Sequence, residues 1–214
     1  MKDIVLTFDD GPDSRYTPVL LDLLRYENIP AAFFVVGNHA KAHPDLIRRM
    51  IDEGHTIGSH TMTHKNLLLS SPSYIHDDFA ACAALHKNLT GEPLHYFRPP
   101  WGINTPLTGK YVRKYGLTQV LWDVMAQDWE AQASATSIVE KIKTRVFDGA
   151  VLCLHDAGED TGGAKGAPMK MIESLIYIIP WLKSQGYHFI TLDQYIEGVN
   201  AHDIPQRKKN LLWA

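Results

Sequence analysis

Short β-rich runs alternate with longer helical patterns along most of the chain, and this alternation restricts the fold more than any other feature of the sequence. Neighbouring parallel strands need a long crossover, which is usually a helix. The pattern therefore predicts an α/β protein with a parallel sheet, closed or open. The predicted strands are Ile4–Phe8, Ala31–Val36, Thr56–Gly58, Tyr96–Arg98, Thr118–Trp122, Val151–Leu154 and His188–Thr191. The predicted helices are Pro18–Tyr26, Pro44–Glu53, Ser73–Asn88, Pro106–Tyr115, Ser137–Phe147 and Met169–Ser184.

The composition indicates one globular domain. The chain has 214 residues, of which 45% are hydrophobic, and a chain of this length is able to bury a full core. Since no run of Pro, Gly or Ser marks a linker, we predict one domain over residues 1–198 and a tail over residues 199–214. The apolar end of this tail, residues 211–213, is able to pack on the domain.

Charge and hydropathy exclude two classes of partner. The formal net charge of -3 does not suit a nucleic-acid-binding protein, which normally presents a basic surface. The longest apolar run near the C-terminus, residues 175–182, is too short to span a membrane. Met1 leads directly into the first predicted strand without a secretory signal, which predicts a cytoplasmic protein as written, or a secreted one if an N-terminal segment precedes it.

Polar side chains of the types that occur in catalytic and metal-binding sites follow several of the predicted strands. In parallel α/β proteins the loops at the carboxyl ends of the strands converge and carry the functional site. The candidates at these positions are Asp9, Asp10, His60, His64, Arg98, residues 123–129 and His155. We therefore expect them to lie near one another.

Asp9 and Asp10 stand next to each other at the end of the first apolar strand. The following Gly11 and Pro12 also suit an ordinary turn, which is the alternative interpretation. The strand before them favours a functional role, because it places two carboxylates at a strand end. One carboxylate with two histidines supplies three metal ligands, and the second carboxylate remains free for metal-assisted hydrolysis.

His60 and His64 have the i, i+4 spacing that brings two imidazoles to one face of a helical turn. His39 and His43 have the same spacing, so one of the two pairs must be accidental. His43 precedes a predicted helix start and suits a position near a helix cap. His60 and His64 follow a strand, and we predict that they are the pair that meets Asp10.

The remaining candidates each have a structural alternative. The run Arg98-Pro99-Pro100-Trp101-Gly102 holds Arg98 and the amide of Trp101 in place, or forms a surface turn with a solvated arginine. Trp129 beside Asp128 suits a flat wall for a sugar ring, whereas Trp122 is expected in the core. His155 ends an apolar strand, where it is either a proton donor or a hydrogen-bonded core histidine.

The ordered motifs resemble those of the polysaccharide deacetylase family, the NodB homology domain of carbohydrate esterase family four. The matching motifs are Thr7–Pro12, His60-Thr61-x-x-His64, Arg98–Gly102, Asp128-Trp129 and Leu154–Asp156. The resemblance implies a distorted (β/α) barrel of about seven parallel strands with surrounding helices. It also implies a metal-dependent hydrolase that removes acetyl groups from N-acetylated amino sugars, in chitin- or peptidoglycan-type oligosaccharides or polysaccharides.

The resemblance further implies a role for each matching residue. The ligands of one divalent metal ion, Zn²⁺ or alternatively Co²⁺, Ni²⁺ or Mn²⁺, would be Asp10, His60 and His64. Asp9 would be the general base, oriented by Arg98, and His155 the general acid. The substrate-binding residues would be Trp101, Asp128, Trp129 and Leu154. The partner would be an acetylated carbohydrate, and the backbone N–H of Trp101 would stabilise the oxyanion.

Two positions depart from the family pattern. The fourth motif usually reads Asp-x-x-Asp-Trp, and its first Asp is expected to pair with the acid histidine, but Met125 stands there. His155 is then less protonated, and so a less effective general acid, at neutral pH, or Asp123 or Asp128 pairs with it instead. The fifth motif usually has Leu two residues before the histidine, but here Cys153 stands in an apolar run that predicts a buried thiol.

Two other functions remain open at this point. One is an amidase or deformylase of the same superfamily that acts on a small acylated compound. The other is a carbohydrate-binding relative whose chemistry has weakened at Met125. The complete set of acidic, histidine and arginine candidates argues against the second alternative.

Overall fold

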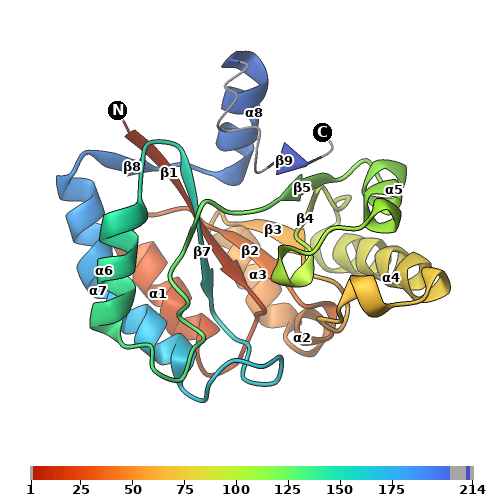
Figure 1. Ribbon diagram of the computed structural model, residues 1–214, viewed down its shortest axis with the longest axis horizontal. Coiled ribbons are helices and arrows are strands. Elements are labelled where there is room, and N and C mark those ends of the chain that lie inside the picture. Colours follow the sequence, from red (N-terminus) through yellow and green to blue (C-terminus); the bar gives the residue numbers. More distant parts are fainter. Residues whose placement is uncertain (1, 203–210, 213–214) are drawn as a thin grey trace.

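A curled sheet forms the centre of the protein, and helices cover its outer face (Figure 1). The computed structural model describes residues 2–202 and 211–212. The strands are β1 (Lys2–Asp9), β2 (Ala32–Val35), β3 (Thr56–Ser59), β4 (Tyr96–Phe97), β5 (Thr118–Val120), β6 (Val124–Met125), β7 (Ala150–His155), β8 (Tyr187–Phe189) and β9 (Leu211–Leu212). The helices are α1 (Thr17–Glu27), α2 (Gly37–Ala42), α3 (Pro44–Asp52), α4 (Pro72–Thr90), α5 (Pro106–Lys114), α6 (Ala135–Arg145), α7 (Ala167–Ser184) and α8 (Leu192–His202), with short 3₁₀ turns η1 (Leu67–Leu69) and η2 (Pro100–Gly102).

The strands run in the order β6-β7-β1-β2-β3-β4-β5-β9, and β8 also pairs with β1. All pairings among β1 to β8 are parallel, whereas β9 pairs with β5 in the antiparallel direction. Every predicted strand is present, and the prediction of a distorted (β/α) barrel is confirmed. Within the described residues no ladder joins β5 to β6, so the barrel is open there.

The two central strands, β1 and β7, set the register of the site. Their pairing runs from Ile4 opposite Ala150 to Asp9 opposite His155. Both strands are buried on both faces, which is why they read as continuous apolar runs. Because parallel strands end at the same edge of a sheet, this register alone brings the polar ends of β1 and β7 together.

The side chains of the sheet point into two separate cores. Those on the inner face pack against Leu192 and Tyr195 of α8, which closes the amino-terminal mouth of the barrel. Those on the outer face pack against α1, α3, α6 and α7. A third cluster lies beneath α4 and α5, on the opposite side of the molecule from α6 and α7 (Figure 1).

The helices begin where the sequence places proline or a capping hydroxyl. Proline occupies the first turn of α1, α3, α4, α5 and α7, where its missing N–H costs no hydrogen bond. Ser71, Thr105 and Ser134 accept hydrogen bonds from backbone N–H groups at the starts of α4, α5 and α6. The short helix α2 and the C-terminal helix α8 were not predicted.

The predicted boundary between domain and tail, at residue 198, lies within α8. Helix α8 runs through this position to His202, and residues 203–210 and 213–214 of the predicted tail lie outside the described residues. Residues 211–212 form β9 and lie beside β5.

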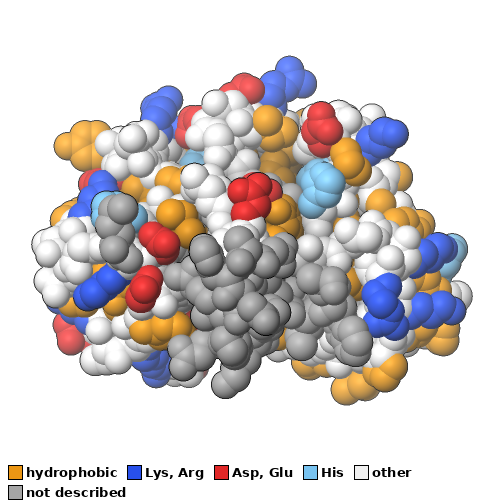
Figure 2. Space-filling view, turned by 90° about the horizontal axis from the view of Figure 1, so that it is seen from above, with side chains coloured by type: hydrophobic (Ala, Val, Ile, Leu, Met, Phe, Trp, Pro, Cys, Tyr) orange, Lys and Arg blue, Asp and Glu red, His pale blue; other side chains and the backbone are white. Residues whose placement is uncertain are grey.

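Seen from the end of the molecule that carries α8, Lys and Arg side chains occur among Asp and Glu side chains (Figure 2). Among the helices of the described residues, none has the length and apolarity that a membrane span requires.

Candidate functional site

The loops at the carboxyl ends of the strands enclose a cavity of about 320 Å³. Its walls include seven of the ten predicted site residues: Asp9, Asp10, His60, His64, Trp101, Trp129 and His155. Residues from β1, β7 and the loops after β3, β4 and β6 therefore meet at one place, as expected from the parallel topology.

Asp10, His60 and His64 form a compact cluster in this cavity. The Oδ1 atom of Asp10 lies 3.5 Å from Nε2 of His60 and 3.2 Å from Nε2 of His64. This oxygen is buried and has no hydrogen-bond partner. A buried carboxylate oxygen without a partner is costly, and one that faces two imidazole nitrogens is a ready ligand for a divalent cation. The donor set therefore fits one metal ion.

Hydrogen bonding orients His60, and burial affects the protonation of His64. Nδ1 of His60 donates a hydrogen bond to the carbonyl oxygen of Arg98 at 2.7 Å, which leaves the lone pair of the imidazole on Nε2. Burial lowers the pKa of His64 to about 4, so that its imidazole is neutral at pH 7. The Oδ2 atom of Asp10 accepts a hydrogen bond from Thr161 at 2.9 Å, which directs Oδ1 toward the two rings.

The segment between the two histidines is not helical, so the predicted helical turn is wrong. Thr61 and His64 have φ angles of 67° and 54°, in the left-handed region that favours glycine. The N–H of His64 donates to the hydroxyl of Thr61 at 3.0 Å and closes the turn. The ring centroids of His60 and His64 still lie 5.0 Å apart. The ligand spacing comes from this closed turn instead of from helical periodicity.

The competing pair, His39 and His43, lies outside the cluster of Asp10, His60 and His64. His39, in α2, has one ring nitrogen 2.7 Å from the carbonyl oxygen of Asp10 and the other 2.8 Å from the carboxylate of Asp160. His43 precedes α3 as its cap residue. Among the described residues, neither histidine belongs to a group of three or more potential metal ligands. His39 instead holds the backbone of Asp10 in place through its hydrogen bond to the carbonyl oxygen of Asp10.

Asp9 is buried and paired with Arg98. Nη1 of Arg98 donates to Oδ1 of Asp9 at 2.7 Å, and the arginine is 0% exposed, which excludes the alternative of a solvated surface arginine. Burial alone would raise the pKa of Asp9, but the positive charge and hydrogen bond of Arg98, together with His60 and His155, hold this pKa below its usual value. Asp9 is therefore a buried, ionised carboxylate.

Arg98 is held by contacts with three strands, β1, β2 and β5. Besides Asp9, it donates to the hydroxyl of Thr7 at 2.8 Å and to the carbonyl oxygens of Val120 and Leu121 at 3.0 Å each. Its guanidinium also lies 4.0 Å from the ring centroid of Phe34. These contacts satisfy the buried cation and fix its position relative to Asp9.

His155 is paired with Asp128, not with a residue at position 125. Asp128 accepts hydrogen bonds from the backbone N–H of His155 at 2.8 Å and from Nδ1 at 3.0 Å. Burial alone would lower the pKa of His155, but Asp128, with smaller contributions from Asp10 and Asp9, raises it to about 9. Of the alternatives left open by Met125, the structure pairs Asp128 with the histidine, while Asp123 accepts the N–H of Val151 at 2.9 Å.

Two predictions for the substrate wall need correction. Asp128 is only 1% exposed and its carboxylate is occupied by His155, so it stands behind the histidine and not on the cavity wall. Leu154 is also 1% exposed and packs in the outer core of the sheet. Successive side chains of a strand point to opposite faces, so Leu154 points away from the side that Cys153 and His155 share.

The aromatic residues form the open part of the wall. Trp101 is 53% exposed, and its ring lies edge-on to His64 with centroids 4.5 Å apart. Trp129 packs edge-on against His155 at 5.0 Å. Trp122 lines the cavity as well, although the sequence pattern placed it in the core. The glycine-rich loop after β7 borders the site, and Thr161 to Gly163 of this loop line the cavity.

Comparison with known proteins agrees with the motifs. The sequence profile described as polysaccharide deacetylase matches residues 1–120. The chain belongs to the polysaccharide deacetylase family. The resemblance predicted from the sequence is therefore confirmed.

Relatives of this polysaccharide deacetylase cover most of its length. A chitooligosaccharide deacetylase of Bradyrhizobium sp. (strain ANU 289) is 34% identical over 198 residues, which are 90% of this chain and 90% of that protein. A peptidoglycan-N-acetylglucosamine deacetylase of Bacillus cereus is 36% identical over 197 residues, or 91% of this chain and 88% of that protein. A family 4 acetyl xylan esterase from Clostridium thermocellum, solved in complex with a cobalt ion, has a TM-score of 0.82 at 33% identity and covers 95% of this chain and 93% of its own.

Proposed function

We propose that this protein is a metal-dependent deacetylase that hydrolyses the acetamido group of N-acetylated amino sugars, in chitin- or peptidoglycan-type oligosaccharides or polysaccharides. One observation carries the proposal. The cavity holds an Asp-His-His cluster in which one carboxylate oxygen lacks a hydrogen-bond partner. Ionised Asp9 and His155, an imidazole with a raised pKa, lie beside this cluster. This is the set of groups that metal-assisted amide hydrolysis requires.

The metal ligands in this proposal are Asp10, His60 and His64, and the metal is Zn²⁺. A divalent cation bound there supplies a Lewis acid that polarises the acetyl carbonyl and makes water more acidic. The cobalt ion in the acetyl xylan esterase structure supports Co²⁺ as a working substitute in experiments.

The residues of the chain perform the proton transfers. Asp9 is ionised and oriented by Arg98, so it accepts a proton from the attacking water as a general base. His155 remains protonated at neutral pH because Asp128 raises its pKa to about 9, and it donates a proton to the leaving nitrogen. An amine is a poor leaving group unless it is protonated, which gives the acid its function.

The substrate class follows from the cavity wall and from the relatives. Exposed Trp101 and the neighbouring Trp129 offer flat aromatic faces next to the reacting groups, a suitable surface for the apolar face of a sugar ring. The relatives include deacetylases of chitooligosaccharides and of peptidoglycan N-acetylglucosamine, and an acetyl xylan esterase. N-acetylglucosamine oligomers are therefore the first substrates to test.

The decisive experiment measures acetate release from chitin oligosaccharides, peptidoglycan fragments and acetylated xylan, with Zn²⁺ or Co²⁺ added to metal-free protein. For Asp9→Asn we expect unchanged binding of one metal ion and a loss of turnover of about 10²-fold or more. The exposed Asp77→Asn serves as the matched control and keeps full activity.

Full activity of the Asp9→Asn protein would refute the base assignment. Turnover confined to small non-sugar amides would favour the amidase alternative, and glycan binding without any turnover would favour a binding protein. Release of acetate from xylan alone would keep the chemistry but change the substrate to an O-acetylated sugar.

A further inference from the structure

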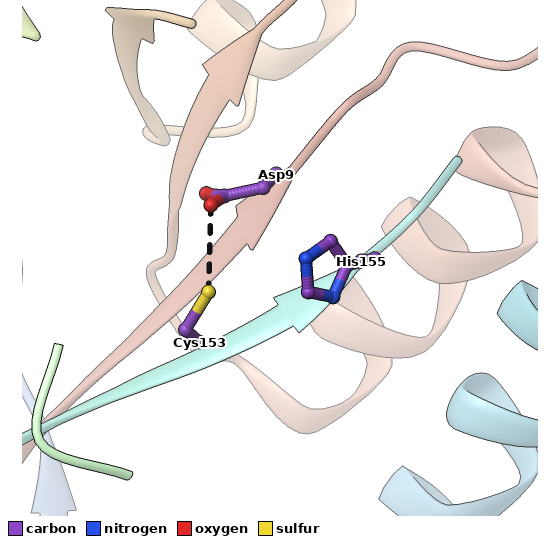
Figure 3. A group of neighbouring side chains, drawn as sticks. All are labelled: Asp9, Cys153 and His155. Atoms are coloured by element: carbon purple, nitrogen blue, oxygen red, sulfur yellow. Dashed lines mark hydrogen bonds between the residues drawn. The ribbon is translucent and has the colours of Figure 1, made fainter. Parts of the chain in front are cut away.

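A second group of potential metal ligands lies next to the Asp-His-His cluster. Asp9 comes from β1, and Cys153 and His155 come from β7 (Figure 3). One ligand atom from each of these residues lies within 4.8 Å of the other two. The register of the two strands produces this group, because Asp9 stands opposite His155 and Cys153 lies two residues earlier on the same face.

The donor atoms of this group are available. Asp9 divides its two oxygens between different neighbours: Oδ1 accepts from Arg98, whereas Oδ2 lies 3.4 Å from the Sγ atom of Cys153. Nδ1 of His155 is bound to Asp128, so Nε2 is the nitrogen left for a ligand. Figure 3 shows the thiol directed at the carboxylate and the imidazole beside them. Asp9 and His155 also line the cavity, which gives a cation a route of entry.

The separations suit one tetrahedral cation. A Zn²⁺ ion binds carboxylate oxygen at about 2.0 Å and thiolate sulfur at about 2.3 Å, so that a tetrahedral angle separates the two ligand atoms by roughly 3.5 Å. The observed separation of 3.4 Å between Oδ2 and Sγ is close to this value. The thiol is also 3.6 Å from Nη1 of Arg98. Burial and Asp9 raise the pKa of this thiol and the positive charge of Arg98 opposes them, so the bound cation itself displaces the thiol proton.

We propose that Asp9, Cys153 and His155 form a second metal site that takes a thiophilic divalent cation such as Zn²⁺ or Cd²⁺. On binding, the S–H bond of Cys153 breaks, a metal–sulfur bond forms and the proton passes to solvent. A proton on Nε2 of His155 leaves in the same way, and no atom changes its oxidation state. Arg98 keeps its hydrogen bond to Oδ1 of Asp9.

A cation at this second site inhibits the enzyme, since it occupies both the general base and the general acid. This consequence rests on the proposed function, whereas the binding itself does not. One metal ion per chain therefore activates the protein, and a second one blocks it. The thiol is the feature that turns a base and an acid into a three-ligand site.

The test is a titration of the metal-free protein with Cd²⁺, followed by bound-metal analysis and by the ultraviolet charge-transfer absorption of a cadmium–thiolate bond. The wild-type protein binds two Cd²⁺ ions and shows this absorption. Cys153→Ser and Cys153→Ala bind one fewer ion and lack the absorption. The matched control is Cys82→Ser, which removes the other buried free thiol and retains both properties.

The inhibition is measured with excess Zn²⁺, each variant being compared with its own activity at one equivalent. Removal of the thiol raises the inhibitory concentration by at least about tenfold. Binding of a single Cd²⁺ by the wild type, or a thiolate absorption that persists in the Cys153 variants, overturns the proposal. If no acetylated glycan is hydrolysed, the proposed function fails, while the Cd²⁺ titration still decides whether the second site exists.

Discussion

The buried charge of Arg98 is acceptable because its guanidinium is bound by several partners. Arg98 is 0% exposed and donates to Asp9, to the hydroxyl of Thr7 and to two backbone carbonyls. A buried ion pair costs desolvation free energy on both sides, and only such complete hydrogen bonding offsets it. Arg98 therefore contributes to the packing of the barrel and also positions Asp9, the proposed general base.

Replacing Arg98 with methionine removes the cation and leaves Asp9 as an unpaired buried charge. We expect the free energy of unfolding in urea to fall by about 3–5 kcal/mol. Arg48→Met, at an exposed position of α3, is the matched control and changes stability by less than about 0.5 kcal/mol. Equal stability of the two variants would show that the Arg98 network contributes nothing net.

The titration of His155 is the most direct measure of its pairing with Asp128. Proton NMR of the metal-free protein is expected to show a pKa of about 9 for this imidazole. In Asp128→Asn burial remains but the attractive charge is gone, so the pKa falls.

The sign of the pH dependence follows from the role of the acid. His155 is useful only while protonated, so acid catalysis is complete below its pKa and is lost as the pH rises through about 9. The alkaline limb of the activity profile moves to lower pH in Asp128→Asn. A His155 titration that is identical in both proteins would contradict the pairing.

At the scale of elements, the two faces of strand β7 have different roles: one face packs in the core and the other faces the site. His155 and Cys153 lie on one face with Asp9, and Leu154 lies on the other face in the outer core. Alternation along a strand makes this division unavoidable. Adjacent residues of one motif consequently have unrelated functions.

This division predicts opposite behaviour for two substitutions. Leu154→Ala is expected to lower the free energy of unfolding by about 2–5 kcal/mol without raising KM for the glycan. Trp101→Ala removes a side chain that is 53% exposed, so it raises KM and leaves stability nearly unchanged. Urea unfolding and steady-state kinetics on both variants check the pair, and a raised KM in a stably folded Leu154→Ala protein would return this residue to the substrate wall.

The loop after β7 orients Asp10, a proposed metal ligand. Thr161 donates a hydrogen bond to Oδ2 of Asp10, and the same carboxylate would collide with any side chain at Gly158, where a Cβ would lie 2.6 Å from Oδ2. The loop thus approaches the carboxylate closely enough to hold it.

We expect Thr161→Val, which keeps the shape but removes the hydroxyl, to weaken metal affinity by about 10- to 100-fold. Thr161→Ser restores the donor and the affinity. Competition with a chelator of known affinity gives the values, and equal affinity of the valine and serine variants would mean that the hydrogen bond does not position Asp10.

For the whole molecule, the cluster of Asp10, His60 and His64 joins parts of the fold that are distant in sequence. Asp10 follows β1, and His60 and His64 follow β3, so a cation bound by all three ties two loops together. A ligand that binds only the folded state stabilises it by mass action. We expect Zn²⁺ at 100 times its Kd to raise the free energy of unfolding by about 2.7 kcal/mol. A calorimetric melting curve in which His60→Ala is stabilised by Zn²⁺ as much as the wild type would contradict this.

The architecture was largely readable from the sequence because its signals are long-range and repeated. Apolar runs separated by helix patterns identified β1 to β5, β7 and β8, whereas the two short strands β6 and β9 were missed. Helices α2 and α8 were missed as well. Six residues of helix are too few for a clear period, and α8 packs through few side chains such as Leu192 and Tyr195.

The finer arrangement of the site was not readable, for physical reasons. Strand β7 is apolar on both faces, so its pattern did not reveal that Leu154 points outward. The partner of His155 depended on whether position 123, 125 or 128 lies beside it, which only the tertiary structure decides. The turn at His60 to His64 uses left-handed residues that are not glycine, so no sequence signal marked it.

Four residues around the cavity have a left-handed backbone: Asp10, Thr61, His64 and Trp101. At these positions thermal stability and activity make opposite demands. Each such residue costs about 1–3 kcal/mol, and glycine or asparagine relieves that cost. Directed evolution for heat tolerance alone would therefore favour replacing these four positions first, and it would produce durable but inert protein. Screens on this scaffold need a catalytic readout in every round.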